Sequence, residues 1–166
     1  MELIEIQTAP EGLPGNDDQA AMASLLVFHL LGLYPGRRFF VLFVIHSDSD
    51  EASLAVPSTT QLLVLSPFVP QYTIHNSYMN ASTTVTVKNY DVKSVQKTIP
   101  VGASAYVKNV IINGKPTASR CHFDFYDTFR LGGEIVIELT AVKALADNCA
   151  GSVPESISTG GFSTVR

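Results

Sequence analysis

The chain has 166 residues, of which 46% are hydrophobic, and a net charge of −4. This is the size and apolar content of one domain with a packed core. The acidic balance excludes the basic surface that nucleic acid or an anionic membrane would require, so we expect neither partner. The longest apolar run of the first half, Phe39–Ile45, is far shorter than the roughly 20 residues that cross a bilayer.

The first predicted element is a helix. Gly12–Asp18 is a turn-rich loop that ends in three residues of the N-cap type. No Gly or Pro interrupts Gln19–Leu31, and Gly32 and Pro35 then provide a stop. Because apolar side chains surround this helix on nearly every side, we expect it to be buried inside a larger protein.

A β-rich region is predicted from residue 56 to residue 142. Its strand candidates either alternate apolar and polar residues or are short apolar runs, and they end at turn residues. These candidates are Gln61–Leu65, Thr83–Lys88, Ala105–Ile112 and Glu134–Leu139. The tail, residues 143–166, becomes rich in Ser, Gly and Thr after Asp147 and is expected to be flexible.

Two cysteines, Cys121 and Cys149, are too few for a zinc site. They form either one disulfide or two free buried thiols. Asn80–Ser82 is a glycosylation sequon, which matters if the chain enters the secretory pathway. Met1–Ile6 carries two acidic residues and does not have the basic start of a signal peptide. The four histidines show no ligand spacing.

The loop and helix of Gly12–Ser24, followed by the Leu-Gly-Leu-Tyr-Pro sequence of Leu31–Pro35, resemble a hallmark segment of glycosyl hydrolase family 92. That family has a Gly-Asn-Asp-Asp loop, a helix with small residues and the same exit. Four later segments resemble the closing strands of the family in the right order: Ser66–Phe68, Tyr72–Ile74, Val110–Lys115 and Leu131–Ile135.

The resemblance implies an exo-acting, calcium-dependent, inverting α-mannosidase built from an N-terminal β-sandwich and an (α/α)₆ barrel. The chain would then be an α+β fragment of a two-domain glycosidase. Residues 1–35 would end the barrel with one buried helix, and residues 56–142 would form a β-rich C-terminal region. The N-terminal β-sandwich and the rest of the barrel would be its missing partners. The substrate would be a mannose-containing glycan such as an N-glycan or a mannan, and the parent protein would be secreted.

Inversion needs a carboxylic acid and a carboxylate roughly 6.5–9.5 Å apart, so that a water fits between the carboxylate and the sugar. By resemblance, Asp18 is the first candidate for the catalytic base and Asp17 the second. Asn16 and Asp17 are candidate Ca²⁺ ligands, and Asn16 and Glu11 are candidate substrate-binding residues. The competing interpretation of this loop is helix capping. The family has an aromatic pair where this chain has Leu25–Leu26.

The general acid of the family lies upstream of the loop, so we expect the isolated chain to be inactive. The alternative is a non-catalytic β-rich fragment with at most residual carbohydrate binding, or a gene fragment that does not fold alone. Residues 36–55 are atypical, since the family runs directly from Pro into Val and Pro35 would join Val56 if these twenty residues were removed. They are explained either by a retained intron, whose splice signals the codons permit, or by a surface insertion.

Overall fold

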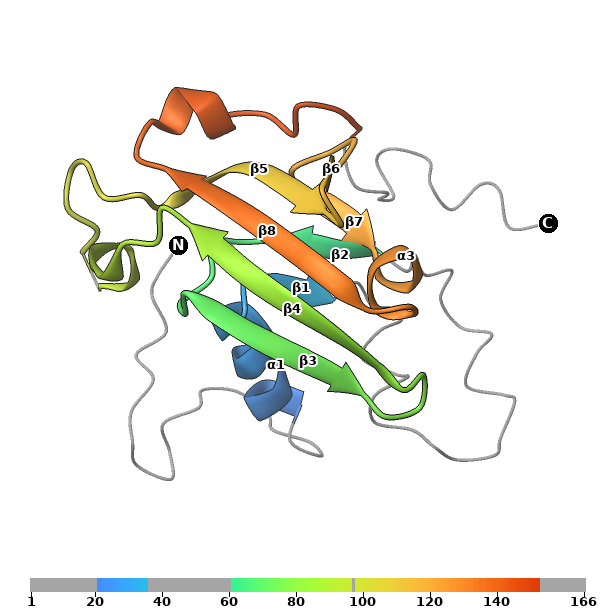
Figure 1. The fold of residues 1–166 in the computed structure, drawn as a ribbon. Coiled ribbons are helices and arrows are strands. Elements are labelled where there is room, and N and C mark those ends of the chain that lie inside the picture. The colour runs from blue at the N-terminus through green and yellow to red at the C-terminus, as the bar shows by residue number, and fades with distance from the viewer. Residues whose placement is uncertain (1–20, 36–60, 97, 153–166) are drawn as a thin grey trace.

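The computed structural model describes residues 21–35, 61–96 and 98–152 (Figure 1). In chain order its elements are α1 (Ala21–Leu30), β1 (Leu33–Pro35), β2 (Gln61–Val64), β3 (Gln71–Asn76), β4 (Ala81–Lys88), η3 (Val92–Val95), β5 (Tyr106–Ile112), β6 (Lys115–Pro116), β7 (His122–Asp124), α3 (Phe125–Phe129), β8 (Gly133–Thr140) and η4 (Lys143–Ala146). Residues 36–55 and the loop before α1 lie outside the described residues.

The described strands form two sheets. The larger has the order β3-β4-β8-β5-β6, with β3 and β6 at its edges. Its two central strands, β4 and β8, run parallel with Val85 opposite Ile135, and the other pairs are antiparallel. The smaller sheet has the antiparallel order β1-β2-β7 and lies behind the larger one in Figure 1. The β-rich architecture predicted for this region is confirmed.

A hydrophobic core lies between the two described sheets, which together we call the sandwich. It is distinct from the N-terminal β-sandwich expected elsewhere in the family. Alternation explains the contribution of β4, since the side chains of Ala81, Thr83, Val85 and Val87 are buried while those between them are more exposed. Both sheets and α3 contribute buried side chains to the cluster: Leu33, Leu62, Val64, Val85, Val87, Val110, Phe123, Phe129, Ile135, Ile137 and Leu139.

Helix α1 behaves differently from this core. Of its residues 23–30, whose side chains are described, none is buried, and Val27 is 54% exposed. Phe28 is partly buried and packs against the core. These exposed apolar side chains agree with a helix whose burial requires a larger protein, and that burial stays a prediction.

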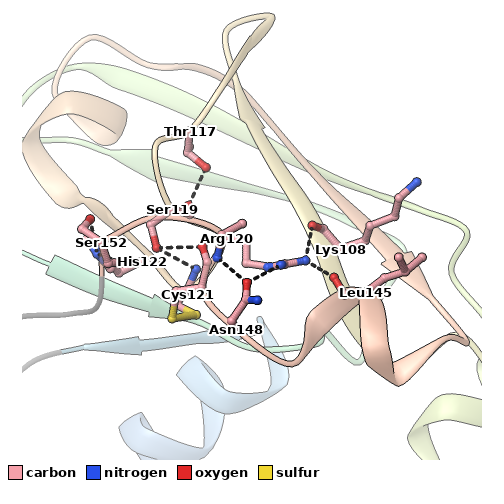
Figure 2. The surroundings of a disulfide bond; sticks show 11 residues. Lys108, Thr117, Ser119, Arg120, Cys121, His122, Leu145, Asn148 and Ser152 are labelled. Atoms are coloured by element: carbon pink, nitrogen blue, oxygen red, sulfur yellow. Dashed lines mark hydrogen bonds between the residues drawn. A yellow bond between two sulfur atoms is a disulfide. The ribbon is translucent and has the colours of Figure 1, made fainter.

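The two cysteines form a disulfide between Cys121, just before β7, and Cys149, after η4. Their Cα atoms are 5.1 Å apart, within the range of native disulfides. This decides between the bonded and free states that the sequence left open. The bond fastens the segment after β8 to the smaller sheet (Figure 2).

Arg120 holds the same segment with hydrogen bonds (Figure 2). Its Nη2 donates to Asn148 Oδ1 at 2.9 Å, and its Nη1 donates to the carbonyls of Leu145 and Lys108. Its backbone N–H also donates to the Cys149 carbonyl at 3.0 Å. Residues 143–152, expected from composition to begin a flexible tail, are therefore fastened to the sandwich at several points.

Candidate functional site

The residues that the sequence identifies as a site, Glu11, Asn16, Asp17 and Asp18, lie outside the described residues. The structure describes the chain from Ala21, three positions after Asp18. The structure therefore shows how α1, the helix that follows the acidic loop, is attached to the sandwich.

Gly32 makes the turn that attaches α1. The helix ends with hydrogen bonds from Leu31 N to Val27 O and from Gly32 N to His29 O, each 3.0 Å long. Gly32 has φ +74°, and a Cβ there would lie 2.6 Å from Pro67 Cγ and 2.7 Å from Leu65 O. Both the left-handed backbone and the close approach require glycine at this position of the Leu-Gly-Leu-Tyr-Pro sequence.

Three hydrogen bonds connect this turn to the sandwich. Leu65 N donates to Gly32 O at 2.8 Å, and Phe68 N donates to Leu30 O at 2.9 Å. From β3, the Tyr72 hydroxyl donates to Leu31 O at 2.6 Å. The carbonyls at the C-terminal end of α1, which have no partner inside a helix, are thus paired with β-region donors. We call this connection the helix hook.

Burial raises the pKa of the Tyr72 phenol above its ordinary value. The hydroxyl therefore stays protonated and remains a donor to Leu31 O over the physiological range. Sequence reasoning placed Tyr72 in a family-like segment but gave it no role. The missing information was that β3 and the end of α1, about 40 residues apart, are neighbours in space.

Next to the helix hook, the ring of His29 in α1 lies 5.3 Å from that of Tyr34 in β1, measured between centroids. The Nε2 atom of His29 is buried and has no hydrogen-bond partner within the described ranges. His75 Nδ1 is 3.0 Å from Ser82 Oγ, and His122 Nε2 is 3.2 Å from Ser152 O. His46 lies outside the described residues.

Three described acidic residues, Asp91, Asp124 and Glu138, have structural partners. Asp124 caps α3, since its Oδ1 accepts from Tyr126 N at 2.8 Å and from Asp127 N at 3.3 Å. Asp124 is also the last residue of β7. A hollow of about 280 Å³ lies beside it, lined by His122, Asp124 and Asp127 among others.

Glu138 on β8 accepts hydrogen bonds from Asn109 Nδ2 at 2.8 Å and from Lys108 Nζ at 3.1 Å. Both hydrogen bonds lower the pKa of the Glu138 carboxyl, and the bond from Asn109 has the larger effect. In the described ranges no three His, Cys, Asp or Glu side chains come together as a metal site would require. The candidate ligands Asn16 and Asp17 lie outside these ranges, so we derive no step through a metal ion. Among the described helices, none is long and apolar enough to cross a membrane.

Comparison with known proteins gives consistent matches. The family model of the glycosyl hydrolase family 92 catalytic domain matches residues 5–48 and 54–141. A curated protein of Arthroderma benhamiae, described as an uncharacterized secreted glycosidase, is 24% identical over 149 residues. That alignment covers 90% of this chain and 16% of the relative.

Two solved structures share the fold. A family GH92 α-mannosidase from Bacteroides thetaiotaomicron aligns with a TM-score of 0.59 at 22% identity, over 90% of this chain and 16% of that one. A family GH92 inverting mannosidase from Bacteroides thetaiotaomicron VPI-5482 aligns with a TM-score of 0.56 at 17% identity, over 89% and 16%. The chain thus spans about 16% of the length of the relatives it matches.

The family match includes the acidic loop, α1, the helix hook and both sheets, and its gap at residues 49–53 falls inside the stretch that the sequence marked as atypical. A match over most of the chain, in a structure with the same β-rich fold, establishes that this chain belongs to glycosyl hydrolase family 92.

Proposed function

We propose that this chain is the C-terminal part of an inverting α-mannosidase that acts on mannose-containing glycans, such as N-glycans or mannans. The observation that carries the proposal is that the Gly-Asn-Asp-Asp loop, the helix and its glycine turn all lie within one continuous family match. The helix hook supports it, because it fixes the C-terminal end of the helix that begins just after this loop. A related GH92 α-mannosidase was solved with mannoimidazole.

In the proposed reaction, Asp18 accepts a proton from the water that attacks the anomeric carbon, and Asp17 is the second candidate for this role. Asn16 and Glu11 bind sugar hydroxyls. We assign no general acid within this chain, and we propose that the acid, the rest of the barrel and the N-terminal β-sandwich come from elsewhere in the working enzyme. The isolated chain is then inactive.

Calcium is part of the proposal through Asn16 and Asp17, whose hard oxygen atoms are the type of ligand that this ion prefers. When bound, the ion orients sugar hydroxyls. The parent protein is proposed to be secreted, in keeping with the description of the Arthroderma relative.

Paired variants test the assignment of the base. In a full-length relative with the same loop, the counterpart of Asp18→Asn should lower kcat by roughly 10²–10⁴-fold, the usual contribution of a general base. Azide should restore turnover in this variant and not in the counterpart of Asp17→Asn, because a small anion replaces the missing water activator. Equal rescue of both variants would remove the assignment. Turnover of α-mannosides by the purified 166-residue chain would contradict its inactivity.

A non-catalytic fragment is the second candidate, favoured by a core whose described buried residues run from Leu33 to Leu139. Titration of the isolated chain with mannose, followed by NMR, distinguishes residual sugar binding from none.

The origin of residues 36–55 as a retained intron is a separate proposal. Mature transcripts that uniformly keep these twenty codons would end it.

A further inference from the structure

The hairpin that joins β3 to β4 presents an asparagine at its tip. Asn76 and Ala81 are the last paired residues, and the turn between them ends at Asn80 (Figure 1). Asn80 is exposed with φ +48°, and its backbone N–H donates to Ser77 O at 3.4 Å. Its side-chain amide makes no hydrogen bond to any part of the chain that the structure describes. The amide nitrogen is therefore available to an enzyme.

Asn80 begins the one Asn-x-Ser/Thr triplet of the sequence. The middle residue, Ala81, faces the core at 8% exposure, while the Ser82 side chain lies on the opposite, exposed face of β4. The acceptor sequence requires a middle residue other than proline and a hydroxyl at the third position, and Ala81 and Ser82 supply them. The tip thus presents both reactive groups of the triplet on the surface.

The disulfide is independent evidence about the compartment. A bond between Cys121 and Cys149 persists in oxidising surroundings, such as the lumen of the endoplasmic reticulum or the outside of the cell. Both cysteines of the chain are used in it. The compartment in which this fold is oxidised is also the one in which asparagine is glycosylated.

An aromatic ring lies next to the acceptor. Tyr78, two residues before Asn80, is 91% exposed, the highest value of any described aromatic residue. Leu131 is 89% exposed and precedes Gly132, where a Cβ would lie 2.4 Å from Ser82 O. Tyr78 lies in the β3–β4 turn and Leu131 in the segment before β8, and both side chains are open to a covering group. The apolar face of a sugar ring packs well against such an aromatic face.

We propose that Asn80 is an N-glycosylation site and that the first sugar of the glycan packs against Tyr78. The donor is an oligosaccharide linked to a polyprenyl diphosphate. A bond forms between Asn80 Nδ2 and the anomeric carbon of the sugar, while the bond from that carbon to the diphosphate oxygen breaks. The diphosphate leaves with the electron pair, and the amide nitrogen passes one proton to a base of the transferring enzyme. The glycan then also shields β3, an edge strand that neighbouring chains could otherwise extend.

Translation of the full chain behind a cleavable leader, with microsomes present, tests the proposal without requiring secretion. Chains protected from added protease are in the lumen, and they should carry one glycan that endoglycosidase removes. Asn80→Gln should abolish it, and Ser82→Thr, which keeps the hydroxyl, should retain it. Mass spectrometry of the tryptic peptide locates the modified residue. A protected chain that stays unmodified at Asn80 would overturn the proposal.

The role of Tyr78 has its own readout. Tyr78→Ala should lower the occupied fraction about twofold or more, since the packing partner of the first sugar is lost. Tyr106→Ala is the matched control, because Tyr106 is also exposed and lies at the far end of the same sheet. Equal occupancy in the two variants would overturn the contact with Tyr78.

Discussion

Helix α1 and the sandwich are both rich in apolar residues. Those of α1 are partly exposed to solvent, whereas those of the sandwich form a buried core. Burial alternates along β4, β8 buries three successive residues, and Val85, Ile135 and Ile137 have no exposed surface. Helix α1 has no polar face, and its side chains at residues 23–30 are half-buried or exposed. Apolar content therefore does not by itself make a core. The sandwich contains its own partners, whereas the helix has surface left for a larger assembly.

The largest expected difference between the two regions comes from truncating one apolar residue in each. Ile137→Ala removes a fully buried side chain and should lower the free energy of unfolding by about 2–5 kcal/mol. Val27→Ala on α1 should change it by less than about 0.5 kcal/mol, because half of that side chain is already in water. Urea unfolding followed by circular dichroism measures both. Equal losses would show that α1 is as tightly packed as the sandwich.

The second largest effect on stability is expected from the disulfide of the sandwich. Replacing Cys121 and Cys149 together by Ser should cost about 2–4 kcal/mol, since the bond closes a loop of 28 residues in the unfolded chain. Reduction of the native chain should give the same loss. Limited proteolysis should then cut residues 143–152 first. A double variant with native stability and protease resistance would mean that the hydrogen bonds of Ser119, Arg120 and His122 are sufficient to hold this segment.

A smaller effect is expected at the helix hook, where the two regions meet. Tyr72→Phe should cost about 0.5–1.5 kcal/mol, because the Leu31 carbonyl loses its donor. The raised pKa of Tyr72 stabilises the fold below the tyrosine pKa of the unfolded chain, and this contribution is lost as the pH rises toward the folded value. Urea midpoints between about pH 8 and pH 11 should therefore fall less steeply in Tyr72→Phe. Parallel curves would contradict the buried phenol.

The smallest effect on stability is expected from a polar substitution on α1, which should clearly change the binding of hydrophobic dyes. The isolated chain should bind hydrophobic dyes strongly or aggregate, since α1 exposes apolar side chains. Val27→Ser should reduce dye fluorescence while shifting the free energy of unfolding by less than about 0.5 kcal/mol. Val92→Ser, at another exposed valine outside α1, is the control and should leave the fluorescence unchanged. A monodisperse monomer that binds no dye would contradict the open helix.

Strands with a regular pattern were predictable. Gln61–Leu65, Thr83–Lys88, Ala105–Ile112 and Glu134–Leu139 each correspond to a strand of the structure within two residues at either end. The β7 strand was missed because its three residues are too few for a period to appear. Of the candidate site, the sequence supplies the acidic loop, and its geometry lies outside the described residues.

The sequence by itself determined the element types, the family and the residues available for a disulfide, because these depend on local periodicity and on motif order. Tertiary structure alone decided that β4 pairs in parallel with β8, that Cys121 reaches Cys149, and that Tyr72 holds the end of α1. Each of these joins groups far apart along the chain. No local pattern encodes such a pairing, since it is the burial of both sheet faces in one core that brings the partners together.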